Sequence, residues 1–167
     1  MAVEILLTRG LATIVDDVDA DWLNQWKWCA NPTQPRGGQP CYYAARNIKI
    51  SHGTYTKVLM HRAIIDAPHK VFVDHINGNK LDNRRSNLRP ATNSQNLANR
   101  HSIKNRYGYL GVWRNQADSG GYYGFITCQG KHHRTVTFPL AEDAAKARDA
   151  LARQLFGDFA MLNFPNQ

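Results

Sequence analysis

The chain has 167 residues, enough for one ordinary domain or for two small units that share a modest core. It carries 21 lysines and arginines against 13 acidic residues, and this formal charge of +8 favours a polyanionic partner, most simply nucleic acid, with an anionic membrane surface as the rival. No stretch approaches the roughly 20 apolar residues of a spanning helix, and the first residues lack the pattern of a secretory leader. We therefore expect a soluble, cytoplasmic protein.

The three cysteines, Cys29, Cys41 and Cys128, are odd in number and widely spaced. This pattern indicates neither a disulfide framework nor a zinc clamp built from paired cysteines. We expect three reduced thiols and no structural zinc.

The first sixty-five residues read as short strands with little helix. Apolar runs alternate with turns, and a stretch rich in proline and glycine separates two of the runs, as is typical of hairpin connections. The expected elements are two strands within 3–15 around a turn at 8–10, a helical turn near 22–26, strands over 42–50 and up to residue 59, and a short helix over 60–65.

The block 71–100 has a different pattern from the residues before it. A short apolar strand is followed by a turn region rich in Asn, Gly and Asp and then by a helix. Thr92 with Gln95 three residues later is a capping-box pattern, so the helix is predicted to begin at Thr92 and to run towards Arg100. Asn96 then falls in its first turn. The block predicts a compact ββα arrangement that must pack on its neighbours, since it is too small to bury much by itself.

Residues 101–107 are basic and lack an apolar period, so we predict a linker there. Beyond it we expect three strands, 110–114, 122–128 and 132–138, and a helix over 141–156 that Gly157 ends in a left-handed cap. Leu140 stands where a capping Ser or Thr would be preferred. The predicted apolar stripe of this helix is Ala144, Ala147, Leu151 and Leu155.

Residues 73–79, Val-Asp-His-Ile-Asn-Gly-Asn, combine side chains that suit phosphodiester hydrolysis. A histidine with a pKa near neutrality can take the proton of an attacking water, which gives His75 the role of general base. Asp74 supplies a charged oxygen and Asn96 a neutral one, a donor set that suits one Mg²⁺ or Mn²⁺ ion better than zinc. Asp74 and His75 would point to opposite faces of a strand, so they share a site only if the strand ends or bends there.

The residues Asp74-His75, Asn87 and Asn96, preceded by Met60-His61-Arg62, resemble the HNH endonucleases of the phage homing and free-standing type, over roughly residues 8–100. The resemblance implies that His75 is the general base, that Asn87 ties the loop and orients this histidine, and that Asp74 and Asn96 bind the metal. The final metal-binding letter is Asn rather than His, as in the homing branch. The zinc-binding cysteines of other branches are missing.

Several residues in this region have a simpler interpretation. Asn77, Gly78, Asn79 and Asn83 are interpreted as turn formers without a chemical role. Isolated cations are most often parts of a solvated face, and an isolated Asp-His pair is most often a local hydrogen bond. Beside a nuclease site, however, cations can contact the DNA backbone. The candidates for such phosphate contacts are Arg62, Arg84, Arg85 and Arg89.

Residues 108–165 resemble the AP2 DNA-binding domain, with Tyr-Leu-Gly-Val at 109–112 and Phe-Pro-Leu-Ala-Glu-Asp-Ala-Ala at 138–145. The resemblance implies that one sheet face lies in the DNA major groove while the helix packs on the other. Leu110 and Trp113 stand where plant-type domains have arginines, which weakens guanine readout. Strand alternation turns Val112, Ile126 and Val136 towards the helix. It assigns to the DNA face Trp113, Asn115, Tyr123, Phe125, Thr127, His132 and Arg134.

The sequence thus predicts an α+β protein with three parts: an HNH nuclease domain over 1–100 with its ββα-metal core at about 71–100, the linker 101–107, and an AP2-like domain over 108–167. The expected activity is metal-dependent cleavage of double-stranded DNA by a monomer, without an obligate protein partner, in the cytoplasm of a bacterial or phage-infected cell. The alternatives are a non-catalytic DNA-binding regulator and a structure-specific or RNA-directed nuclease.

Overall fold

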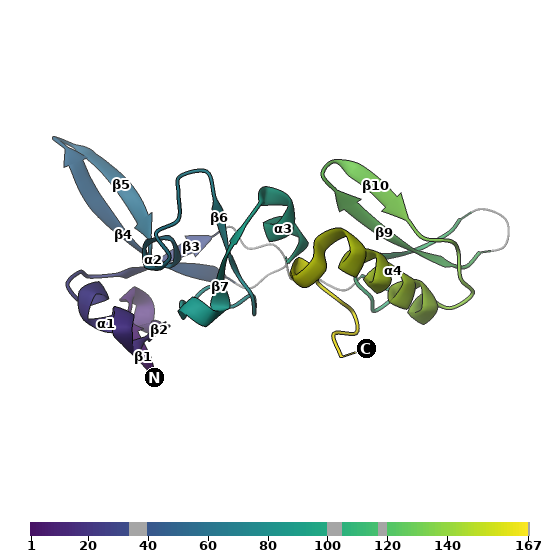
Figure 1. Cartoon of the computed structure of the whole chain (residues 1–167), viewed down its shortest axis with the longest axis horizontal. Coiled ribbons are helices and arrows are strands. Elements are labelled where there is room, and N and C mark those ends of the chain that lie inside the picture. Colours follow the sequence, from purple (N-terminus) through teal and green to yellow (C-terminus); the bar gives the residue numbers. More distant parts are fainter. Residues whose placement is uncertain (34–39, 100–104, 117–119, 167) are drawn as a thin grey trace. The chain divides into compact units, whose positions relative to one another are not determined.

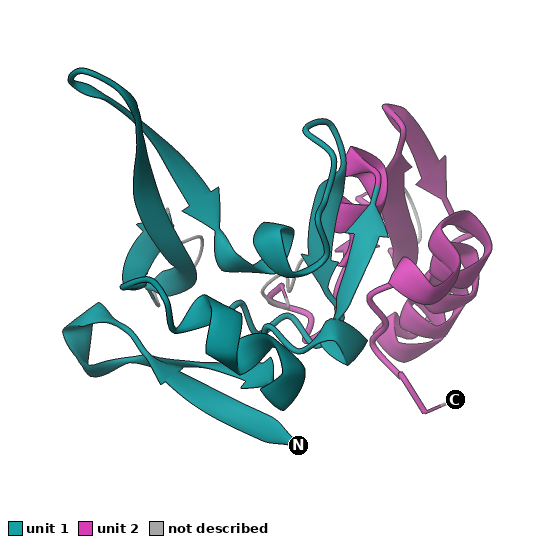
Figure 2. Cartoon of the chain, turned by 60° about the vertical axis from the view of Figure 1, so that its left-hand side comes forward, with its two compact units in different colours: residues 1–91 teal, residues 92–167 magenta. Residues whose placement is uncertain are grey.

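The computed structural model (Figure 1) describes residues 1–33, 40–99, 105–116 and 120–166. The described chain combines several small antiparallel sheets with few helices, which is compatible with the predicted α+β class. It divides into two compact units, residues 1–91 and 92–167, coloured separately in Figure 2. Within the described residues, no helix is both long and apolar enough to cross a bilayer. Residues 101–104 of the predicted linker lie outside the described residues.

The first unit starts with a two-stranded sheet. β1 (Ala2–Leu6) pairs antiparallel with β2 (Ala12–Asp16) around a 3-10 turn at Thr8–Gly10, and α1 (Asp17–Leu23) follows. The two strands predicted around this turn are confirmed. The helix begins some five residues before the helical turn that was predicted near 22–26.

A second sheet has the strand order β3-β4-β5 and is formed by Cys29–Thr33, Cys41–Ser51 and Thr54–Leu59. The strands predicted over 42–50 and up to 59 are confirmed, and so is the short helix, α2 (Met60–Ile64). β3 was not predicted, because its sequence contains Asn31 and Pro32 and lacks an apolar alternation.

A third sheet carries the sequence predicted to hold the site. β6 (Phe72–His75) pairs antiparallel with β7 (Leu88–Ala91), which places Asp74 opposite Arg89. The second strand of the predicted ββα arrangement was not located in the sequence, because β7 is short and contains Pro90, which a two-stranded sheet tolerates at its edge.

Helix α3 (Asn93–Ala98) comes next in the chain and is counted with the second unit. Its predicted capping box is confirmed: the Gln95 backbone N–H donates to Thr92 Oγ1 at 3.2 Å, and the Thr92 N–H donates to Gln95 Oε1 at 2.8 Å. The helix therefore begins directly after Thr92, and Asn96 lies in its first turn.

The core of the first unit joins its sheets and helices. Its largest fully buried apolar side chains are Leu23, Trp28, Met60 and Val15, and the Trp28 indole N–H donates to the Leu23 carbonyl at 2.9 Å. Val73 and Leu88 belong to the same cluster. The hairpin β6-β7 is thereby packed on the rest of the unit through its apolar side chains.

The second unit contains a three-stranded sheet and one long helix. The order is β10-β9-β8, from Lys131–Arg134, Tyr122–Cys128 and Val112–Arg114, and α4 spans Ala141–Phe156. The bounds predicted for β9 and α4 are confirmed. Gly157 ends the helix with φ 54° and ψ −131°, so its φ is positive, but its conformation is not the predicted left-handed helical one. β10 ends at Arg134, so Val136 does not continue the alternation. It is 73% exposed, and its predicted packing on the helix is wrong.

The buried face of α4 differs from the predicted stripe. It consists of Ala144, Ala145, Arg148, Asp149 and Ala152. Of the predicted stripe only Ala144 is buried, whereas Ala147, Leu151 and Leu155 are half-buried.

Asp149 explains why the face is rotated. Its carboxylate accepts the backbone N–H groups of Asn163 and Phe164 at 2.6 and 2.9 Å, and it also pairs with Arg148. Buried charge is tolerated when it is paired and hydrogen-bonded. The segment at Asn163 and Phe164 therefore holds the Arg148–Asp149 pair on the buried face of α4. Apolar periodicity alone could not identify a buried face that contains charged residues.

Gly124 lets α4 approach the sheet closely. A Cβ atom at this position would lie 2.5 Å from the Arg148 Cβ and 3.1 Å from the Ala144 carbonyl oxygen. The helix backbone therefore occupies the space that any other residue would need.

We predict that Gly124→Ala destabilises the protein by about 1–3 kcal/mol, because the added methyl group forces α4 away from β9. The measurement is the thermal unfolding midpoint of the full chain. Gly130→Asn is the control, because that position has φ 76°, which asparagine tolerates, and open space around it. Equal midpoints for Gly124→Ala and wild type would contradict the close approach.

Candidate active site

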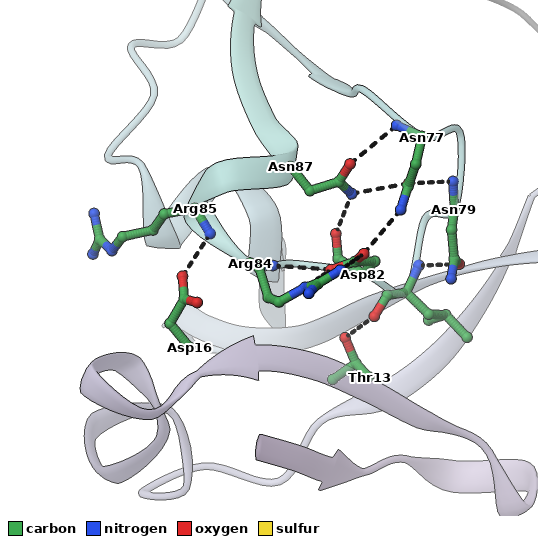
Figure 3. A network of polar contacts seen from close by, with 9 residues as sticks. Thr13, Asp16, Asn77, Asn79, Asp82, Arg84, Arg85 and Asn87 are labelled. Atoms are coloured by element: carbon green, nitrogen blue, oxygen red, sulfur yellow. Dashed lines mark hydrogen bonds and ion pairs between the residues drawn. The ribbon is translucent and has the colours of Figure 1, made fainter. Parts of the chain in front are cut away.

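The loop between β6 and β7 is closed by a network of side-chain amides centred on Asn87 (Figure 3). The Asn87 carboxamide accepts the Asn77 backbone N–H at 3.0 Å and donates to the Asp82 carbonyl at 2.7 Å. It also donates to Asn77 Oδ1 at 3.0 Å. One buried side chain thus ties together both ends of the loop.

Asp82 forms the second centre of this network. Its carboxylate accepts the Asn77 amide at 2.8 Å and the Arg84 guanidinium at 2.6 Å. The Arg84 hydrogen bond is the main reason why the pKa of Asp82 is lowered, so its charge persists at neutral pH. The loop is therefore held by a charged pair as well as by amides.

The same loop is bonded to β2. The Ile14 N–H donates to the Leu81 carbonyl at 2.8 Å, and the Asn83 N–H donates back to the Ile14 carbonyl at 2.7 Å. Residues 81–83 therefore lie against β2 like a short extra strand. This pairing brings Thr13, far away in sequence, next to Asn83.

A one-way chain of hydrogen bonds runs from His75 through Asn83 and Thr13. The Thr13 hydroxyl donates to the Leu81 carbonyl at 2.8 Å and accepts the Asn83 amide N–H at 2.7 Å. The Asn83 carboxamide oxygen then lies 3.1 Å from His75 Nε2. Because a carbonyl only accepts, the chain has one consistent direction, and it places the proton of neutral His75 on Nε2. Nδ1 is then the nitrogen that carries the lone pair.

His75 lies among other rings. Its ring centroid is 5.0 Å from that of His61, in an edge-on arrangement, and 6.0 Å from that of Tyr43. His75 is 1% exposed, and burial is the main reason why its pKa is lowered. The imidazole is therefore neutral at pH 7 and can accept a proton.

His61 is the second buried histidine. It is 5% exposed, and its Nδ1 has no hydrogen-bond partner among the described residues. Burial lowers its pKa to about 3, and the neighbouring His75 acts in the same direction. His61 is therefore neutral and acts here as a packing surface for His75.

Asp74 lies on the same strand as His75 and is 4% exposed. Its Oδ2 accepts the Nε of Arg89 at 2.9 Å and lies 2.9 Å from the Arg89 Nη2. Asp74 and His75 are the last two residues of β6, where they pair in register with Arg89 and Leu88.

The four arginines predicted to contact phosphate are all engaged within the first unit. Arg62 donates to the carbonyls of Ala67, Pro68 and Val71, and so braces the segment before β6. The other three pair with carboxylates: Arg84 with Asp82, Arg85 with Asp19, and Arg89 with Asp74. In this arrangement Arg62 braces backbone carbonyls, and the other three hold carboxylates of the first unit.

The second predicted metal ligand, Asn96, is half-buried on α3 and is counted with the second unit. Among the described residues, no group of three or more His, Cys, Asp or Glu side chains is placed to hold a metal. A carboxylate such as that of Asp74 and a carboxamide such as that of Asn96 are each hard oxygen donors of the kind that Mg²⁺ or Mn²⁺ prefers.

The sheet face of the second unit carries linked aromatic and cationic side chains. The Arg134 guanidinium lies 3.7 Å from the centroid of the Tyr123 ring, and the Phe125 and His132 rings are 5.3 Å apart. Trp113, paired with Tyr123 in register, is 50% exposed. Val112 and Ile126 are buried, as alternation predicts.

The two remaining polar residues assigned to this face also bond near it. Thr127 Oγ1 lies 3.0 Å from His132 Nδ1. Asn115 is half-buried and reaches Thr137 Oγ1 at 3.5 Å. Six of the seven residues predicted for the DNA face thus lie on the same side of β8, β9 and β10, and Asn115 directly follows β8.

Both residues of the hydrogen-bond chain behind His75 were missed by the sequence interpretation. Asn83 was assigned to a turn, yet it is fully buried and bonds to His75. Thr13, seventy positions earlier, was given no role. No local pattern could have signalled either residue, because each acts through a pairing between distant segments.

Comparison with known proteins adds an independent finding. A family model described as HNH endonuclease matches residues 66–98. A protein named as an uncharacterized HNH endonuclease, from Acanthamoeba polyphaga mimivirus, is 30% identical over 160 residues, which cover 95% of this chain and 79% of that protein. No solved structure matches the chain.

Buried His61 makes the fold sensitive to acid. Its pKa is about 3 in the folded chain against 6.5 for an ordinary histidine, so only the unfolded chain binds a proton between these values. Stability present above pH 6.5 is therefore lost as the pH falls towards 3.

When the pH falls from 8 to 5, we predict that the free energy of unfolding decreases by about 2 kcal/mol less in His61→Leu than in wild type, because leucine cannot titrate. Urea unfolding at the two pH values measures this difference. His75 leaves both proteins some acid sensitivity, since its pKa is also lowered. His52→Leu, at an exposed histidine, is the control. The same loss in His61→Leu and wild type would refute the buried neutral state.

Proposed function

The chain belongs to the HNH endonuclease family, and we propose that it is a metal-dependent DNA endonuclease that hydrolyses phosphodiester bonds. The observation that carries this proposal is the directed chain of hydrogen bonds from His75 through Asn83 and Thr13 to the Leu81 carbonyl. It holds one buried, neutral histidine in a single tautomer.

In this proposal His75 is the general base. Its Nδ1 takes the proton of the water that attacks the phosphorus atom, while the proton on Nε2 stays in its bond to Asn83. The resulting imidazolium is supported by that same hydrogen bond, which favours the charged form of His75. Asn87 keeps the loop that carries Asn83 closed, and is therefore a positioning residue.

Asp74 and Asn96 are the proposed ligands of one divalent cation, Mg²⁺ or Mn²⁺. When bound, the cation would neutralise charge on the phosphate and on the leaving 3′ oxygen. Arg89 pairs with the Asp74 carboxylate at 2.9 Å and so fixes the position of this side chain.

The proposed substrate is double-stranded DNA, contacted by the sheet face of the second unit through Trp113, Tyr123 and Arg134. A chain with one catalytic histidine cuts one strand at a time, so we propose a nicking or homing-type enzyme that leaves 5′ phosphate and 3′ hydroxyl ends. Two chains or two successive events would be needed for a double-strand break.

We predict that His75→Ala loses cleavage of supercoiled plasmid in Mg²⁺ or Mn²⁺ by at least roughly 100-fold, because no other group takes the water's proton. A reaction with EDTA is the blank. His69→Ala is the matched control, because His69 is an exposed histidine in the same unit. DNA affinity, measured on a labelled duplex without metal, is expected to stay unchanged in both variants.

Two outcomes would count against the proposal. Wild-type protein that binds DNA and leaves it intact with either metal would favour a DNA-binding regulator built on the same fold. Equal cleavage by His75→Ala and His69→Ala would remove His75 from the reaction.

A further inference from the structure

The hairpin of β4 and β5 extends away from the rest of the first unit in both views (Figures 1 and 2). Every residue from 49 to 57 is exposed, including Ile50 and Tyr55 at 64% and 63%. We call the paired segment 46–58 the arm. An exposed two-stranded ribbon of this kind has the width that the major groove of B-DNA admits.

The charged residues in and around the arm are all basic. Residues 22–65 contain six lysines and arginines and no acidic residue, whereas all acidic residues of the first unit lie in 4–21 and 66–82. An acid-free basic segment attracts phosphate and repels none of it. The arm therefore has the charge complementarity that a DNA backbone requires.

One face of the arm carries its lysines. In register, Asn47 pairs with Lys57 and Lys49 pairs with Tyr55, so these four side chains lie on the same face of the hairpin. The opposite face carries Ala44 and Val58, which pack in the core cluster at the base. We call the side with Lys49 and Lys57 the lysine face.

The lysine face is continuous with the candidate site. Strand alternation places Tyr43 on the same side of β4 as Asn47 and Lys49, and the Tyr43 ring contacts the rings of His61 and His75. Lys80 Nζ lies 5.1 Å from the Tyr43 ring centroid. From Tyr43 to Lys49 the strand covers about 20 Å, the length of about six base pairs.

The lysines of this face are available, unlike the arginines of the site. The Lys49 ammonium forms no hydrogen bond or ion pair with any described residue, and the Lys57 ammonium donates to a neutral partner, Asn31, at 2.8 Å. Beside them a hollow of about 190 Å³ opens among side chains that include Cys29, Asn31 and Asn47. These cations can meet phosphate without breaking an ion pair.

We propose that the arm is a DNA-binding element whose lysine face holds the phosphate backbone of duplex DNA beside the His75 site. The inference rests on the proposed function for its choice of DNA. It gives the first unit a binding surface of its own, separate from the sheet face of the second unit.

The test measures binding of a labelled random-sequence duplex across a salt series, with the full chain carrying His75→Ala so that the DNA stays intact. Lys49→Gln with Lys57→Gln is compared with Lys70→Gln and Lys146→Gln, a pair of exposed lysines off the arm. The arm variant is expected to flatten the slope of log K against log salt by about two, and the control to leave it unchanged. Thermal unfolding midpoints verify that both variants fold.

Equal slopes for the arm variant and the control overturn the inference. The same series is run with a labelled single-stranded RNA, and a loss of binding confined to that RNA overturns the choice of duplex DNA. If wild type cuts DNA while the arm variant binds like the control, the arm proposal fails alone. If the arm variant loses binding but wild type never cuts, the arm stands and the proposed nuclease activity fails.

Discussion

The hydrogen bond between His75 Nε2 and the Asn83 carboxamide is the constraint on which the site depends. Asn83 can turn its oxygen towards the ring only because its amide N–H is committed to Thr13, whose hydroxyl is committed to the Leu81 carbonyl. A buried polar group without a partner costs about 1–3 kcal/mol, so flipping the amide would be opposed at both of its ends. The chain thereby fixes which nitrogen of His75 can act as a base.

The loop that carries Asn83 contains few apolar side chains. Its conformation is held mainly by hydrogen bonds between polar groups. Asn87 and Asp82 bond to Asn77 and to loop backbone, while Arg84 keeps Asp82 charged. Such networks add little net stability, since they replace bonds to water. Their effect is to exclude other loop conformations, and the position of the base depends on that.

Much of the local structure followed from the sequence, because it rests on neighbouring residues. The capping box at Thr92 and the end of α4 at Gly157 are local, and so is the strand that carries Asp74 and His75. The misses concern distant pairings. Strand β7 exists because Leu88 and Ala91 meet β6, the buried face of α4 is set by a segment that follows it, and Asn83 reaches His75 only through its pairing with β2. The composition indicated a basic protein. It could not show that Arg84, Arg85 and Arg89 pair with carboxylates of the same unit.

The role of Asn83 in holding His75 as a base can be measured by the single-turnover cleavage rate of Asn83→Leu beside Asn83→Asp. Aspartate still offers an oxygen to Nε2, whereas leucine offers none. We expect a rate lowered roughly 100-fold in the leucine variant and largely kept in the aspartate variant, with DNA affinity equal in both. Equal rates for the two variants, with both chains folded, would contradict it.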